Sequence, residues 1–261
     1  MRRLVKGVIV IGWALAALAG VVWLGPQDTP AQSTGLVVLS SNGVKPAVEG
    51  LVPQLERSTG QRVTVQFGSS KPLNEKIQAG EPFDVAILTS DNIDDLIRQG
   101  KIAPDTRSEF ARTGIGVGIR AGAAKPDIAT PEALKRTLLN AKSITLNPTG
   151  ASATYVHAML ERMGIAENVK GKLILDAGSG QPQRNVAEGR AELVFTLIPE
   201  IVFFPGVELA GPLPATFQNY ISFAAGVATN SRKAEAAKAL VRFLTSPAAE
   251  PILRAKGLEP R

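Results

Sequence analysis

Residues 36–67 read LVVLSSNGVKPAVEGLVPQLERSTGQRVTVQF, and this stretch indicates the fold class. Its apolar start, Leu36 to Leu39, predicts a buried strand, and residues 62–67 alternate between polar and apolar as a second strand does. Residues 44–57 place apolar side chains on one face of a helix, which Gly60 ends. A strand, a helix and a strand in succession predict a mostly parallel sheet covered by helices.

The same alternation of apolar runs and amphipathic stretches continues to the end of the chain. We expect further strands at residues 83–88, 114–120, 144–146, 173–175, 191–197 and 220–228. We expect helices at residues 71–78, 91–99, 152–163, 183–188, 232–244 and 247–256, and one that begins at Pro131. Ser90 and Thr130 stand where they can cap two of these helices.

These elements predict an α/β fold with two lobes of similar size. The strands at Gly114 and Tyr220 are the natural crossings between the lobes. Lobe one is expected to comprise residues 36–112 plus 224–261, and lobe two residues 113–223.

The composition excludes several classes of function. The chain has 261 residues, a formal charge of +6 with its basic residues spread out, and only 5% aromatic residues, which disfavours a surface that stacks nucleobases. It has no cysteine, so disulfides, thiolate metal sites and a cysteine nucleophile are excluded. No Ser-His-Asp motif, phosphate-binding glycine signature or metal-ligand cluster is present. We therefore expect no metal, no cofactor and no nucleic-acid partner.

The first residues have the features of an export signal. Three basic residues precede an apolar run at residues 7–25, and a polar segment follows that contains Ala31. This pattern predicts a secretory signal peptide, residues 1–31, cleaved after Ala31, and places the mature protein in the periplasm. The apolar run is almost long enough to span a bilayer, so an uncleaved membrane anchor is the alternative.

Six short motifs occur in a fixed order along the rest of the chain: Phe67-Gly68-Ser69-Ser70, Phe83-Asp84-Val85-Ala86-Ile87, Asn147-Pro148-Thr149-Gly150-Ala151, Leu193-Val194-Phe195, Phe243-Leu244-Thr245-Ser246 and Lys256-Gly257. Together they resemble the molybdate-binding family of periplasmic solute-binding proteins, the receptors of ABC importers. The resemblance implies a type II periplasmic-binding-protein fold, an anion held between two lobes, an ABC permease as partner and a monomeric state.

The residues themselves indicate an anion site in four loops that lead from a strand into a helix. Backbone N–H groups and the positive end of the helix dipole meet in such loops, and serine hydroxyls add donors. Any one of these loops alone is more often an ordinary helix cap, but open α/β sheets bind ligands where several converge. The expected ligand-binding residues are Ser40, Ser41, Asn42, Ser69, Ser70, Thr149, Gly150, Ala151, Gly180 and Gln181.

Two positions depart from the family pattern. Gly43 stands where the family carries a serine that donates to the oxyanion, and Phe195 aligns with a family tyrosine. The expected ligand is therefore a small anion, either a molybdate-like oxyanion or an organic acid.

An enzyme is the second hypothesis, because the group that the chain resembles also contains a periplasmic aconitate isomerase. Such an enzyme would need a proton-transfer group, for which Lys71, Tyr155 and His157 are weak candidates, and Arg184 could clamp a carboxylate. Glu200 is a possible base that nothing in the sequence distinguishes from an ordinary loop acid. Lysines and a lone histidine on a helix are more often surface residues.

Overall fold

The predicted α/β architecture is present in the computed structural model, which describes residues 35–261. The expected signal peptide, residues 1–31, lies outside the described residues. Within residues 35–261, every helix is too short or too polar to traverse a lipid bilayer.

The first lobe is built on three parallel strands. β1 (Leu36–Ser41) lies between β2 (Val63–Gly68) and β3 (Val85–Thr89). Next to β3 follows β9 (Tyr220–Val227), which runs antiparallel to it. The strand, helix and strand expected at the start of the chain are therefore present, and they place the carboxyl ends of β1, β2 and β3 at one edge of the sheet.

The second lobe repeats this plan with shorter strands. β5 (Ile144–Leu146) pairs in parallel with β6 (Leu173–Leu175) and with β7 (Leu193–Leu197). An additional strand, β8 (Val207–Pro212), pairs antiparallel with the long strand that connects the lobes. The sequence pattern had not indicated β8, because its alternation is broken by glycine and proline near its end.

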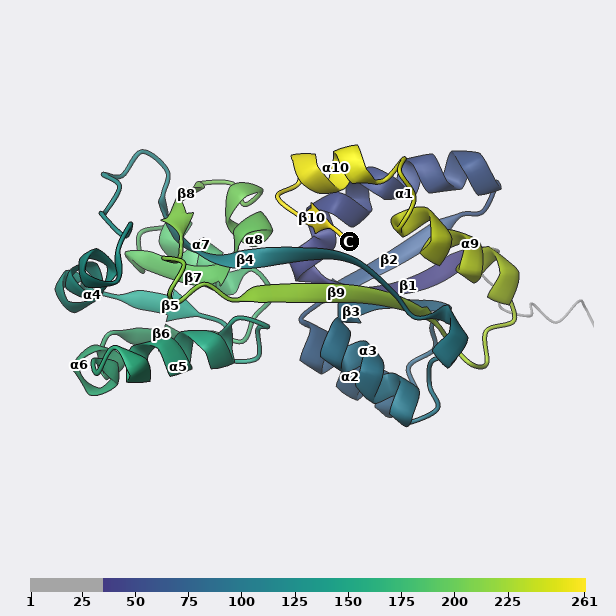
Figure 1. Cartoon of the computed structure of the whole chain (residues 1–261), viewed down its shortest axis with the longest axis horizontal. Helices are drawn as coiled ribbons and strands as arrows, with labels where there is room; N and C mark the ends of the chain where they lie inside the picture. Colours follow the sequence, from purple (N-terminus) through teal and green to yellow (C-terminus); the bar gives the residue numbers. More distant parts are fainter. Residues whose placement is uncertain (1–34) are drawn as a thin grey trace, which may run out of the picture. The chain divides into compact units, whose positions relative to one another are not determined.

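The connecting strand, β4 (Ser108–Arg120), belongs to both lobes. Residues 108–114 pair with β9, and residues 115–119 pair with β7. The resulting sheet has the order β2-β1-β3-β9-β4-β7-β5-β6 (Figure 1). All pairs of β4 and β9 are antiparallel, so the expectation of a mostly parallel sheet is wrong for the crossing region. The residue boundaries expected for the lobes stay a prediction.

Helices cover both faces of the sheet in each lobe. The first lobe carries α1 (Lys45–Thr59), α9 (Ala234–Leu244) and α10 (Glu250–Ala255) on one side, and α2 (Ser70–Gln78) and α3 (Ser90–Arg98) on the other (Figure 1). The second lobe carries α4 (Pro131–Asn140), α5 (Ala153–Arg162), α6 (Ala166–Lys170), α7 (Gln181–Ala187) and α8 (Ile198–Val202). Short 3-10 turns η1 (Asn42–Val44) and η2 (Pro104–Thr106) complete the order.

The two predicted caps have different outcomes. Thr130 caps α4, since its hydroxyl oxygen accepts a hydrogen bond of 3.1 Å from the N–H of Ala133. Ser90 is the first residue of α3 rather than its cap, and its hydroxyl donates to Glu109 at 3.2 Å. β3 runs as far as Thr89, so Thr89 takes the capping position that the sequence assigned to Ser90.

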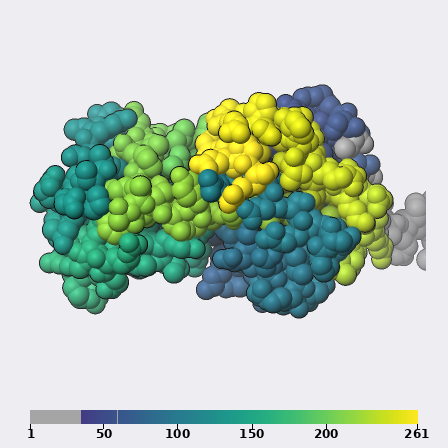
Figure 2. Space-filling view, in the orientation of Figure 1, coloured from purple at the N-terminus to yellow at the C-terminus, as the bar shows by residue number. Residues whose placement is uncertain are grey.

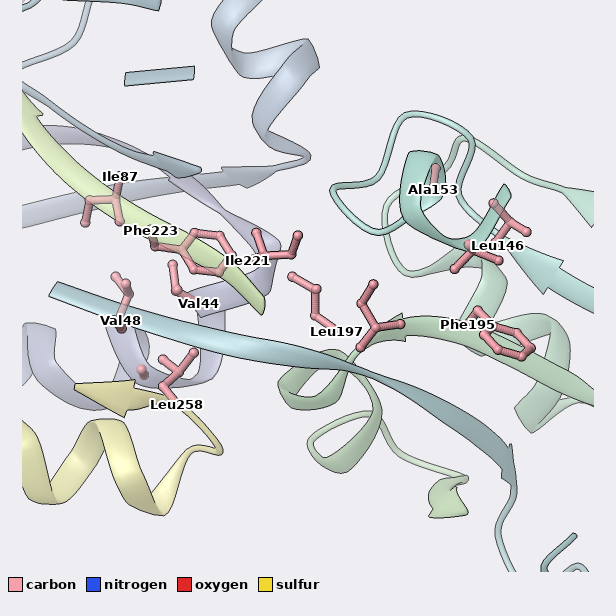
Figure 3. Packing of buried hydrophobic residues seen from close by; sticks show 14 of the residues in the cluster. Val44, Val48, Ile87, Leu146, Ala153, Phe195, Leu197, Ile221, Phe223 and Leu258 are labelled. Atoms are coloured by element: carbon pink, nitrogen blue, oxygen red, sulfur yellow. The ribbon is translucent and has the colours of Figure 1, made fainter. Parts of the chain in front are cut away.

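The apolar core continues from one lobe to the other along β4 and β9. Leu197 of the second lobe lies beside Ile221 and Phe223 of β9, close to Val44 of the first lobe (Figure 3). A separate cluster within the second lobe packs closely against Gly118 of β4, where a β-carbon would lie 2.7 Å from a methyl group of Val194. The end of the chain forms β10 (Glu259–Pro260) against β4, and the final residues, drawn in yellow, cover part of the first lobe (Figure 2).

Candidate functional site

A small cavity lies between the lobes, where the loops that follow their strands meet. We call it the interlobe cavity, and its volume is about 20 Å³. The first lobe lines it with Ser41, Asn42, Gly43, Ser69 and Ser70. The second lobe lines it with Asn147, Gly150, Ala151, Gly180, Pro182 and Gln183, and with Thr196, Leu197 and Glu200 at the junction of β7 and α8.

All four loops that were expected to bind a ligand reach this cavity, but three of the expected residues do not line it. Ser40 lies inside β1 and is fully buried, with its hydroxyl directed to the carbonyl of Ser41. Thr149 lines a neighbouring, wider pocket. The side-chain amide of Gln181 donates to Asn185 at 3.2 Å, within α7. Their roles in binding stay predictions.

Three serine hydroxyls of the cavity act as acceptors in the bonds that position them. Ser41 accepts a bond of 3.3 Å from the N–H of Gly43, and Ser70 accepts one of 3.1 Å from the N–H of the last residue of β3. Ser69 accepts one of 3.3 Å from the side-chain amide of Asn147. A hydroxyl that accepts retains its own hydrogen for donation. These serines can therefore donate to an anion while they hold their loops in place.

Side-chain amides connect the two lobes beside the cavity. Asn42 donates from Nδ2 to the Ser179 hydroxyl at 2.7 Å, and Asn147 donates to Ser69 as described. Asn147 also accepts at Oδ1 from the N–H of Thr149, at 2.9 Å, which orders the turn before α5. The loops that supply the donors thus also hold the lobes in contact.

Helix starts add to the positive character of the cavity. The loops that line it lead into α1, α2, α5, α7 and α8, whose N-terminal N–H groups carry partial positive charge. Neutral donors arranged in this way can bind an anion without a full countercharge.

Glu200 is the charged residue among those that line the interlobe cavity. Its carboxylate accepts a hydrogen bond from the Thr196 hydroxyl, and its side chain is partly buried. Burial raises the pKa of Glu200, while hydrogen bonds from Thr196 and from the backbone of Leu197 oppose that shift. A carboxyl group in a cavity of anion donors was not indicated by the sequence, in which Glu200 had no distinguishing mark.

The departure from the family pattern at Gly43 has a steric cause. A β-carbon on Gly43 would lie 2.6 Å from Cδ1 of Leu197 and 2.6 Å from Cζ of Phe223, so any side chain there would require these two residues to move. Phe195 is buried in the core of the second lobe (Figure 3), whereas Thr196 and Leu197 of the same strand line the cavity. The alignment of Phe195 with the family tyrosine stays a prediction.

A wide pocket of about 730 Å³ adjoins the interlobe cavity and shares Ser70, Gly150 and Ala151 with it. Lys71 and Tyr155, two of the proposed proton-transfer residues, line this wide pocket. His157 lies on the exposed side of α5 and lines neither space.

Further cationic side chains lie around the interlobe cavity and the wide pocket. Arg107 lines the wide pocket, and its hydrogen bond to Asp94, of 2.5 Å, raises the pKa of Arg107. Arg184 lines a second opening, of about 670 Å³, on the other side of the interlobe cavity. Lys45 borders the same opening and pairs with Glu49 at 3.5 Å.

No group of three or more histidine, aspartate or glutamate side chains within residues 35–261 is arranged to hold a metal ion.

Two curated proteins are similar to nearly the whole chain. An aconitate isomerase from Pseudomonas sp is 28% identical over 234 residues, which cover 87% of this chain and 88% of that protein. The molybdate-binding protein ModA of Azotobacter vinelandii is 27% identical over 257 residues, which cover 95% of this chain and 98% of that protein.

Solved structures agree on the fold. The periplasmic molybdate-binding protein of Azotobacter vinelandii superposes with a TM-score of 0.71 at 21% identity, covering 86% of this chain and 98% of its own. The sulfate-binding protein SubI of Mycobacterium tuberculosis H37Rv gives 0.72 at 18% identity, covering 87% of each chain. The model of one family, described as bacterial extracellular solute-binding protein, matches residues 36–259, and the chain belongs to that family.

Proposed function

We propose that this protein is a monomeric periplasmic receptor that captures a small anion in the interlobe cavity and delivers it to an ABC permease. The observation that carries the proposal is the convergence of hydroxyl and N–H donors from both lobes on one enclosed space. Closure of two lobes around a ligand is a common hinge motion, and it lets a permease distinguish loaded from empty receptor.

The size of the cavity favours a compact ligand. Its volume in the structure is about 20 Å³, close to that of one water-sized body. A tetrahedral oxyanion such as molybdate, tungstate or sulfate requires only a small separation of the lobes, whereas a tricarboxylate must extend into the wide pocket. The relatives that bind molybdate and sulfate support the compact class.

Thermal unfolding with a panel of anions tests the receptor function. The panel is molybdate, tungstate, sulfate, phosphate, citrate and cis-aconitate. An anion at 100 times its Kd stabilises the folded state by about 2.7 kcal/mol, which raises Tm by about 5 to 10 °C for a chain of this size. Ser69→Ala should reduce that rise. Ser58→Ala is the control, because the Ser58 hydroxyl donates to a helix carbonyl outside the cavity. A panel without any shift would contradict the proposal.

An isomerase is the second candidate, favoured by the wide pocket and by the similarity to an aconitate isomerase. The pocket is large enough for a tricarboxylate, and Lys71 and Tyr155 can exchange a proton with a ligand there. Isomerisation removes a proton from one carbon and returns one to another while the double bond shifts.

Incubation of the protein with cis-aconitate, followed by separation of the two isomers, decides between the candidates. Turnover that is lost in Lys71→Met or Tyr155→Phe, and kept in His157→Ala, would show that the protein is an isomerase and not a receptor. Saturable binding without conversion would leave the receptor as the function.

A further inference from the structure

We propose that Glu200 makes the interlobe cavity accept an anion only together with one proton, which either the ligand or Glu200 itself carries. The proposal rests on the anion-binding function above and names its ligand class: anions that bear a hydroxyl group or an acidic proton. Fully deprotonated oxyanions bind only by recruiting a proton to the protein.

Glu200 lies in the interlobe cavity, which is otherwise lined by uncharged residues. An ionised carboxylate has acceptor oxygens and no donor, so it cannot hydrogen-bond to a deprotonated oxyanion. Two negative charges in one small cavity also repel each other more strongly than they would in bulk water. One proton between the two groups turns this repulsion into a hydrogen bond.

The hydrogen bond from Thr196 depends on the protonation of Glu200. Thr196 lines the cavity, and its hydroxyl donates to the Glu200 carboxylate, so an ionised Glu200 occupies the hydrogen of Thr196. When Glu200 is protonated, the acid can donate to Thr196, and the Thr196 hydrogen can turn to the ligand. Protonation therefore adds a donor to a cavity in which Gly43 and Leu197 supply no side-chain donor.

Burial is the largest cause of the raised pKa of Glu200 and acts in the same direction. Glu200 also lines the neighbouring opening, where the other charged side chains are Lys45, Glu49, Arg184 and Lys256. Those on β4 and β8, which pack against α8, are Glu109, Arg112, Arg120 and Glu208. Lys45 pairs with Glu49 at 3.5 Å and Arg112 with Glu259 at 2.7 Å, so these cations have carboxylate partners other than Glu200.

Glu200 also has a structural role at the start of α8, which is distinct from proton uptake. Glu200 is the third residue of α8 and bonds back to the backbone of Leu197, as the glutamate of a capping box does. Glutamine serves equally well at that position. Glu200→Gln therefore preserves the cap, removes the ionisable group and supplies a permanent donor.

Calorimetric titration with molybdate between pH 5.5 and 8, in two buffers of different ionisation enthalpy, tests the proposal. The wild-type protein should take up about one proton on binding, and its affinity should fall by up to about tenfold per pH unit above the pKa of Glu200. Glu200→Gln should bind without proton uptake and with a flat pH profile. Glu49→Gln removes an acid from the neighbouring opening and should keep the wild-type profile.

Citrate and tricarballylate, which differ by one hydroxyl group, test the ligand class at pH 8. The wild-type protein should prefer citrate by about tenfold, and Glu200→Gln should lose that preference.

Binding of molybdate without proton uptake and equal affinity for the two acids would overturn the role of Glu200 and leave the receptor function intact. Absence of binding by every anion would instead overturn the receptor function, and this inference with it. If Glu200→Gln does not fold, proton uptake by the wild-type protein alone decides.

Discussion

The side-chain amide of Asn42 donates a hydrogen bond of 2.7 Å to the hydroxyl of Ser179, and so connects two loops that are 137 residues apart in the sequence. A second bond of 3.3 Å, from Asn147 to Ser69, connects the lobes in the same way. Asn42, Asn147 and Ser69 also line the interlobe cavity. The side chains that connect the lobes therefore also line the cavity that we propose as the binding site.

Removal of the Asn42–Ser179 bond should weaken ligand binding without unfolding the protein. We expect Asn42→Ala to reduce the affinity for the anion identified in the panel by about 2- to 10-fold, since one hydrogen bond contributes about 0.5–1.5 kcal/mol. The double variant with Ser179→Ala should lose little more than either single variant. Calorimetric Kd values for the four proteins give the coupling, and fully additive losses would show that the bond does not hold the closed state.

A serine at position 43 should destabilise the fold through its contact with Leu197. The added β-carbon meets Leu197 and Phe223 at 2.6 Å, and crowding of this kind costs about 1–3 kcal/mol. Leu197→Ala opens the space, so the double variant should lose less stability than the two single changes added together. Urea denaturation gives the free energy of unfolding of Gly43→Ser, Leu197→Ala and the double variant.

Gly171→Ser is the matched control for this series, because no heavy atom lies within 4 Å of a β-carbon at that position. Its stability should stay within about 0.5 kcal/mol of the wild-type value. Equal losses for Gly43→Ser and Gly171→Ser would exclude the steric explanation.

The stability of the ligand-free protein should depend on pH through Glu200. Burial raises its pKa above the ordinary value of 4.5, so the folded state binds this proton more tightly than the unfolded state does. The resulting stabilisation is complete below pH 4.5 and is lost as the pH rises through the raised pKa. Tm of the wild-type protein should therefore fall relative to Glu200→Gln between pH 5 and 8. Parallel curves for the two proteins would contradict this expectation.

Asp84 should contribute to stability and not to binding. Its buried carboxylate accepts from the N–H of Val37 at 2.9 Å and from the Ser231 hydroxyl at 2.7 Å, so it connects β1 to the segment before α9. Asp84→Ala leaves these donors without the carboxylate and should cost about 2–4 kcal/mol in urea denaturation. Glu161→Ala, at an exposed helix position, should cost little. Anion affinity should be unchanged in both, since neither residue lines the interlobe cavity.

The local elements of this protein could largely be predicted from its sequence. Apolar runs with strand or helix periodicity, and glycine or threonine at the helix ends, mark residues that fold with their immediate neighbours. β5 was predicted to the residue at 144–146. The two helices that were missed, α6 and α8, have five residues each, too few to show a helical repeat.

The candidate site could be predicted only to the level of its loops. Strand alternation assigns Phe195 and Leu197 to the same face of β7, but it does not say that Leu197 extends past the sheet to the cavity while Phe195 stays in the core. Ser40 and Ser41 differ in a similar way. Ser41 lines the cavity, whereas Ser40 is enclosed between neighbouring strands.

The sequence by itself determined an α/β fold whose serine- and glycine-containing loops lead into helices, because these features depend on hydrogen bonds and apolar periodicity within short segments. Only the tertiary structure decided that Glu200 and Thr196 join those loops, that Leu197 excludes a side chain at Gly43, and that Asn42 meets Ser179. Each of these relations connects residues whose proximity or environment depends on how the two lobes pack. The electrostatics of a cavity depend on burial, which short segments of sequence do not specify.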